Sequence, residues 1–249
     1  KALDKAGAVV GPLVAYGLLS WLGESAETYQ TLFWVAFVPA VISVLVLTRI
    51  TDQPGVPHER ESISQNWQAL SPAFKRFLLP AGIFALAYLS LGFLLLKAHD
   101  AGFSVAQIVL LYALFNTTCV MAAPLVGKLG DRVGRSRIIV LGYTLYGLIN
   151  LGLVFTTSRW EITVAFAFYG FFYSIDESQS KAFIADLEPE RRATAVGVYN
   201  FVTGVLYLPA SLVAGALWTV SPGLALGLAA GLSLVAIIVF WFMRPASGS

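Results

Sequence analysis

The stretch Gly127-Lys-Leu-Gly-Asp131-Arg132-Val-Gly134-Arg135-Ser-Arg137 is a charged interruption between two long apolar runs of this chain. Its glycines permit a tight turn and a close approach of backbones. An aspartate near the end of one helix can accept hydrogen bonds from the N-terminal amides of another, where the helix dipole favours negative charge. The stretch therefore predicts a short polar loop that joins two helices and carries an acid suited to docking on a neighbouring helix.

The composition of the chain points to a lipid environment. Hydrophobic residues make up 57% of the 249 residues and charged residues only 12%, whereas a soluble domain usually carries about 25% charged residues. The formal net charge of +2 is too small to suggest a nucleic-acid partner. Cys119 is the one cysteine, so no internal disulfide can form. We therefore expect the lipid bilayer to be a partner of most of the surface.

Eight apolar stretches are long enough to be membrane-spanning helices, which need roughly 20 residues each. No ten-residue alternation of the kind found in membrane barrels is present, so the predicted fold class is all-α and polytopic. The predicted spans are Ala6–Leu22, Tyr29–Thr48, Phe77–Leu96, Val105–Leu125, Ile138–Thr156, Trp160–Phe183, Ala193–Trp218 and Pro222–Met243.

The basic residues define an orientation, because lysine and arginine favour cytoplasmic loops. With eight spans, 14 of the 16 basic residues fall on one side of the membrane, and only Lys97 and Arg159 fall on the other. This split predicts that both termini of the chain are cytoplasmic.

The longest polar segment, residues 49–76, separates two spans from the six that follow. Trp67, Leu70, Phe74 and Phe77 recur within and just after it at helical spacing. We expect a cytoplasmic linker followed by a short amphipathic helix at the membrane surface.

No motif for enzyme chemistry is found. The segment His58-Glu59-Arg60-Glu61-Ser62 lacks the second histidine of the zinc motif H-E-x-x-H, and neither a G-x-S-x-G elbow nor a P-loop is present. His58 and His99 lie in predicted loops far apart in the sequence. We expect neither an enzyme nor a bound cofactor or metal.

Two motifs resemble those of the major facilitator superfamily. The loop from Gly127 to Arg137 resembles its signature G-x-L-a-D-r-x-G-r-k (motif A), with Ser136 in place of the usual basic residue. Gly7-Ala-Val-Val-Gly11-Pro12 resembles the glycine–proline signature of the fifth helix (motif C), found mostly in drug/proton antiporters. Small residues at this spacing are also common wherever membrane helices pack closely, so generic packing remains an alternative for the second motif.

The resemblance implies a division of the chain within a twelve-helix transporter. Residues 1–48 would be the last two helices of the N-terminal half, residues 49–76 the central linker, and residues 77–249 the complete C-terminal half. The chain begins at Lys1, without an initiator methionine or a signal-peptide pattern. We therefore expect that about four N-terminal helices are missing from it, and these helices would be its partners in the whole protein.

The function implied by the resemblance is secondary active transport of a small molecule by alternating access, coupled to a proton and directed toward efflux. The expected location is the inner membrane of a bacterium. A non-transporting receptor or scaffold on the same fold is the alternative, and flux from proteoliposomes distinguishes the two.

In the family, the aspartate of motif A holds the two halves together on the cytoplasmic side. Pseudo-symmetry implies that Asp131 docks at the start of the first span, around Asp4–Gly7. Arg132 and Arg135 are expected to pair with nearby acids such as Asp186. Alternatively, these arginines only enforce the topology and contact lipid phosphates. Gly127 and Gly134 complete the motif.

Polar residues inside the spans are candidates for a cavity, because ionisable groups at membrane depth are costly and often functional. Asp176 lies in the cytoplasmic third of the sixth span and could face the cavity, where it would bind a substrate or a proton or act as a gate residue. Glu177 could also face the cavity, or it could simply pair with Lys181 one turn further on. Interhelical packing is the alternative for the remaining candidates, which are Tyr112, Asn116, Asn150, Tyr173 and Asn200.

Overall fold

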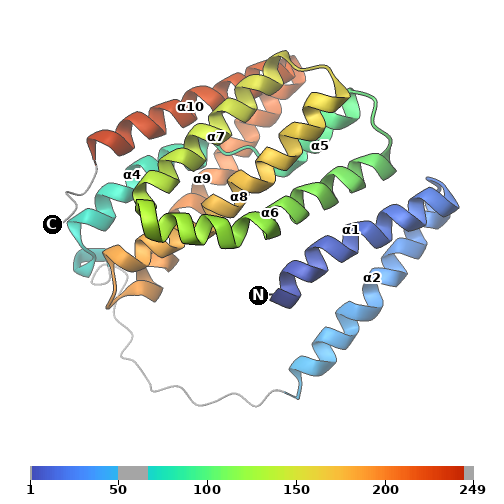
Figure 1. The fold of residues 1–249 in the computed structure, drawn as a ribbon, viewed down its shortest axis with the longest axis horizontal. Helices are drawn as coiled ribbons and strands as arrows, with labels where there is room; N and C mark the ends of the chain where they lie inside the picture. The colour runs from blue at the N-terminus through green and yellow to red at the C-terminus, as the bar shows by residue number, and fades with distance from the viewer. Residues whose placement is uncertain (1, 50–66, 244–249) are drawn as a thin grey trace.

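The computed structural model describes residues 2–49 and 67–243, with side chains from Gly7 onward, and these residues contain helices and no strand. In Figure 1, most of these helices lie side by side along a common direction. The helices are α1 (Ala2–Leu22), α2 (Ala26–Leu47), α4 (Pro72–Ala87), α5 (Leu91–Asp100), α6 (Val105–Val133), α7 (Arg135–Phe155), α8 (Arg159–Leu187), α9 (Arg192–Val220) and α10 (Pro222–Phe242).

The predicted all-α, polytopic fold class is confirmed. Within the described residues, six spans are long and apolar enough to cross a membrane: α2, α4 with α5, α6, α7, α9 and α10. The apolar part of α1 is shorter, from Gly7 to Leu22. Helix α8 has 29 residues but carries several charged side chains in its second half. The chain is therefore an integral membrane protein.

Local sequence signals explain where α6 begins and ends. Ser104 and Gln107 form a capping box at its start: Ser104 Oγ accepts a hydrogen bond from Gln107 N, and Gln107 Oε1 accepts one from Ser104 N. The helix ends at Val133, and its C-cap Gly134 has a φ of 97°. Residues with a Cβ rarely adopt this conformation, so the glycine allows α7 to start directly after α6.

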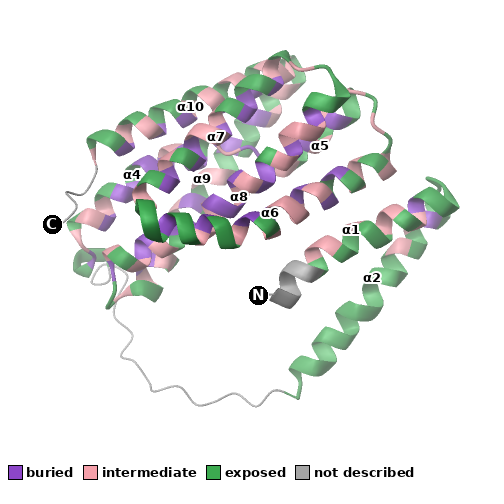
Figure 2. Ribbon diagram, viewed as in Figure 1, coloured by how far each residue is buried: buried purple, intermediate pink, exposed green. Residues whose placement is uncertain are grey.

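Helices α4 to α10 form one bundle in which α8 packs closely against α6 and α7. Glycines make these approaches possible. A Cβ on Gly170 of α8 would overlap Thr118 and the carbonyl of Phe115 on α6, and a Cβ on Gly142 of α7 would lie 2.7 Å from the Ile175 side chain. Figure 2 shows that the buried positions concentrate where these helices face one another. The position of α8 is therefore fixed from two sides.

Helices α1 and α2 form a hairpin beside the bundle. Helix α1 runs along α6, and the turn between α1 and α2 contacts the start of α6, where Glu24 Oε1 accepts a hydrogen bond from Ala106 N at 3.0 Å. Thr28 is the one buried residue of α2, and most of that helix is exposed along its whole length (Figure 2).

The structure corrects the predicted boundaries of the third span. Helix α4 begins at Pro72 after the N-cap Ser71, so Phe74 and Phe77 are in its first turns and are buried, rather than in a separate helix at the membrane surface. In the rest of the predicted amphipathic helix, residues 67–69 are helical, Trp67 is 44% exposed and Leu70 is buried, while the part before residue 67 lies outside the described residues. The predicted continuous span Phe77–Leu96 is also interrupted at residues 88–90, between α4 and α5.

A substitution of Gly170 tests the close packing of α8. We expect Gly170→Ala to lower the melting temperature in detergent clearly, because overpacking a tight core costs about 1–3 kcal/mol. Gly152→Ala in α7 is the control, because a Cβ there meets no atom within 4 Å. Equal melting temperatures for the two variants would contradict the described packing.

Candidate functional site

A polar pocket of about 330 Å³ lies inside the bundle between α8, α9 and the break after α4. Its polar lining ranges from buried groups, such as Ser180 and Thr203, to exposed ones, such as Lys181 and Asn200. Its lining residues, which define the polar pocket below, are Tyr88, Tyr173, Asp176, Glu177, Ser180, Lys181, Tyr199, Asn200, Thr203 and Tyr207.

Helical periodicity brings these side chains together. On α8, residues 173, 176–177 and 180–181 are spaced by three or four positions, so they share one face. On α9, Tyr199, Thr203 and Tyr207 are spaced by four and form the opposite wall. Tyr88 enters from the interruption between α4 and α5. The pocket therefore has two helical walls and one wall made by a broken helix.

The pocket combines charge with unused hydrogen-bonding capacity. Asp176 and Glu177 contribute two carboxylates against the single ammonium of Lys181, which leaves the lining formally negative. The Ser180 hydroxyl is only 1% exposed and lies beside Asp176 and Tyr199. It makes no hydrogen bond of good geometry with any described residue. A buried hydroxyl of this kind is available to a ligand or a water molecule.

Four of the seven polar residues singled out from the sequence line this pocket: Tyr173, Asp176, Glu177 and Asn200. The expected pairing of Glu177 with Lys181 stays a prediction.

The other three candidates lie elsewhere. Asn116 Nδ2 donates to the carbonyl of Tyr112 on α6 at 2.9 Å, and Tyr112 is 37% exposed. Asn150 is buried on α7 and donates to the carbonyl of Tyr146 at 2.8 Å.

Sequence reasoning missed most of the α9 wall and Tyr88. The regular spacing of Tyr199, Thr203 and Tyr207 is visible in the sequence and could have identified the wall as a polar stripe on an apolar helix. Tyr88 has no such signal, because its position depends on an interruption of its helix.

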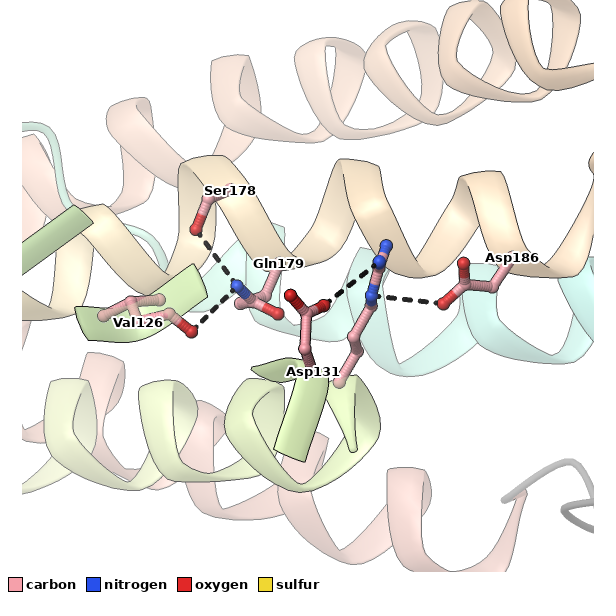
Figure 3. A network of polar contacts seen from close by, with 6 residues as sticks. Val126, Asp131, Ser178, Gln179 and Asp186 are labelled. Atoms are coloured by element: carbon pink, nitrogen blue, oxygen red, sulfur yellow. Dashed lines mark hydrogen bonds and ion pairs between the residues drawn. The ribbon is translucent and has the colours of Figure 1, made fainter. Parts of the chain in front are cut away.

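A second polar network joins the turn between α6 and α7 to the end of α8 (Figure 3). Arg135 Nε lies 3.2 Å from Asp186 Oδ2, which confirms the predicted pairing, and Arg135 Nη2 lies 3.5 Å from Asp131 Oδ1. Gln179 Nε2 donates to the carbonyl of Val126 at 3.2 Å. Gly130 lies beside it, and a Cβ there would overlap the Gln179 amide, so a larger residue would require this side chain to move.

The remaining motif residues have fewer contacts. Arg132 makes no ion pair with another described residue, and a Cβ on Gly127 would meet open space. A Cβ on Gly7 or Gly11 of α1 would likewise meet no atom within 4 Å, and Pro12 lies inside that helix. The expected docking of Asp131 around Asp4–Gly7 falls largely on side chains outside the described part of the chain.

Comparison with known proteins identifies the family. Residues 84–249 match the family described as Major Facilitator Superfamily. An uncharacterized MFS-type transporter of Methanocaldococcus jannaschii is 28% identical over 250 residues, which cover 98% of this chain and 62% of the relative. Uncharacterized proteins of Mycobacterium tuberculosis and Mycobacterium bovis are each 26% identical over 254 residues, which cover 98% of this chain and 61% of each relative.

The chain therefore belongs to the major facilitator superfamily, a family of membrane transporters and not of enzymes. It spans about three-fifths of the length of the relatives it matches.

Proposed function

We propose that the chain is part of a secondary active transporter that moves a small molecule by alternating access. The observation that carries this proposal is the polar pocket, in which two carboxylates face four tyrosines inside a membrane-spanning bundle. Ionisable groups in such a position mark substrate or ion pathways, and transporters of this general design place their site near the bilayer midplane.

The chemistry of the pocket favours one class of substrate. A negative lining with aromatic rings attracts a cation through both charge and ring faces, so we infer an amphiphilic substrate that carries a protonated amine. Asp176 can bind that cation or a proton in turn, which supports proton-coupled antiport. The resemblance of Gly7, Gly11 and Pro12 to an antiporter motif supports export as the direction.

The arrangement of helices supports the proposed division of the chain. Helices α1 and α2 stand beside the bundle and would be the last two helices of an N-terminal half, while α4 to α10 would be the six-span C-terminal half. The exposed sides of α2 are where the other N-terminal helices, as partners, and lipid would pack. The basic residues support cytoplasmic termini in a bacterial inner membrane.

Asp176→Asn in the full-length protein, reconstituted into proteoliposomes, tests the role of the pocket. We expect flux of a cationic amphiphile to fall at least about tenfold, because a hydrogen-bonded charge partner is lost, and the residual flux to lose its dependence on a proton gradient. Glu161→Gln is the control, since Glu161 lies in the first turn of α8, outside the pocket. Normal flux and pH dependence in Asp176→Asn would exclude the proposed role, and absence of flux from the unaltered protein would favour a receptor or scaffold.

Asp131 is proposed to hold the two halves together on the cytoplasmic side. Its side chain is 72% exposed, and its one ion pair with another described residue is the long contact with Arg135, so it has capacity for a further partner. We expect Asp131→Asn to shift the protein toward the inward-open state, measured as greater labelling of single cysteines on the cytoplasmic side and lower transport. Unchanged accessibility and unchanged transport would show that the residue has no gating role.

A further inference from the structure

The span Pro72–Asp100 is interrupted inside the bundle. Helix α4 ends at Ala87, Tyr88 has the extended dihedral angles φ −73° and ψ 108°, and α5 begins at Leu91. In a continuous helix, each backbone N–H bonds to the carbonyl four residues earlier. The interruption removes that pattern at Leu89, at a depth where lipid offers no replacement partners.

Two tyrosine hydroxyls from other helices take over the released backbone groups. Leu89 N donates to Tyr146 Oη of α7 at 2.7 Å, and the same hydroxyl donates to the carbonyl of Ala87 at 2.9 Å. Tyr169 Oη of α8 donates to the carbonyl of Leu89 at 3.0 Å. One amide and two carbonyls of the break are thus satisfied by side chains that lie more than 50 residues away in the sequence.

Both rings are held firmly where they lie. Tyr146 is 0% exposed and Tyr169 is 3% exposed, and their centroids are 6.0 Å apart. Each ring also packs against Phe172, with centroid distances of 4.8 Å for Tyr146 and 5.4 Å for Tyr169. The hydroxyls therefore meet the break from a rigid aromatic cluster.

The break determines where Tyr88 points. Its ring stacks on Tyr146 at 5.8 Å with an interplanar angle of 3°, lies 5.3 Å from Tyr207, and forms part of the polar pocket. A regular helix through residues 88–90 would turn the Tyr88 side chain relative to α9. The orientation of the Tyr88 ring therefore depends on the hydrogen bonds that its neighbours Ala87 and Leu89 make with Tyr146 and Tyr169.

We propose that Tyr146 and Tyr169 are positioning residues: their hydroxyls hold the α4–α5 break open and so set Tyr88 in the wall of the polar pocket. The holding of the break by these two hydroxyls, called the clamp below, is inferred from the hydrogen bonds alone. The part that concerns binding rests on the proposed transport function.

Hydrogen–deuterium exchange of the full-length protein in lipid nanodiscs tests the clamp. In Tyr146→Phe we expect the Leu89 amide to exchange about tenfold faster, which is the effect of losing one hydrogen bond. Tyr169→Phe removes a single hydrogen bond to a carbonyl and should increase amide exchange in the same segment less strongly. This second variant keeps the test informative if Tyr146→Phe folds poorly.

Tyr143→Phe is the matched control. Tyr143 is buried in the same cluster, with its ring centroid 3.8 Å from that of Phe84. Its hydroxyl makes no hydrogen bond to a described residue of the break. Exchange at Leu89 that is unchanged in both Tyr146→Phe and Tyr169→Phe, or altered equally in the control, would overturn the clamp.

Transport kinetics test the positioning of Tyr88. We expect Tyr146→Phe and Tyr88→Ala to raise KM for a cationic amphiphile severalfold with a smaller change in kcat, and Tyr143→Phe to leave KM unaltered. Faster exchange at Leu89 with an unaltered KM would overturn the positioning role. If the unaltered protein shows no flux, the proposed function fails, while the exchange result still decides whether the hydroxyls hold the break.

Discussion

The absence of water in the bilayer core is the constraint on which the rest of this structure depends. Every backbone N–H and C=O at that depth must be paired inside the protein, so long uninterrupted helices are the default. Residues 88–90 are not helical, and there Tyr146 and Tyr169 supply hydroxyls from neighbouring helices as hydrogen-bond partners for the backbone. The same interruption brings Tyr88 to the polar pocket. One local exception to helical hydrogen bonding thus shapes the site.

Helix α8 connects the two polar regions of the molecule. It carries Asp176 in the pocket, Gln179 against the backbone of α6, and Asp186 in the ion pair with Arg135. Close contact through Gly170 and Gly142 holds the helix against its neighbours. One continuous helix thus carries both the acid of the pocket and the acid that pairs with the turn between α6 and α7.

The parts that the sequence predicts well are those set by local patterns. Hydrophobic length predicts the spans, and the charges of the Gly127–Arg137 loop predict the pairing of Arg135 with Asp186. Helical spacing places Tyr173 and Asp176 on one face. It leaves Asn150 open between a cavity and interhelical packing, and the structure shows this residue buried, with its side-chain amide bonded to the Tyr146 carbonyl of its own helix. The break at Tyr88 could not be predicted, because it depends on hydroxyls contributed by helices distant in sequence.

A pocket that serves transport must be reached from water although it lies inside a membrane bundle. Thiol labelling of Asn200→Cys with a charged, membrane-impermeant reagent, in full-length protein that also carries Cys119→Ser, tests it most directly. Leu212→Cys on the same helix is the reference, because Leu212 is 67% exposed on an apolar surface outside the pocket. We expect rapid labelling at position 200 and little at position 212, whereas equally slow labelling at both would contradict a role of the pocket in transport.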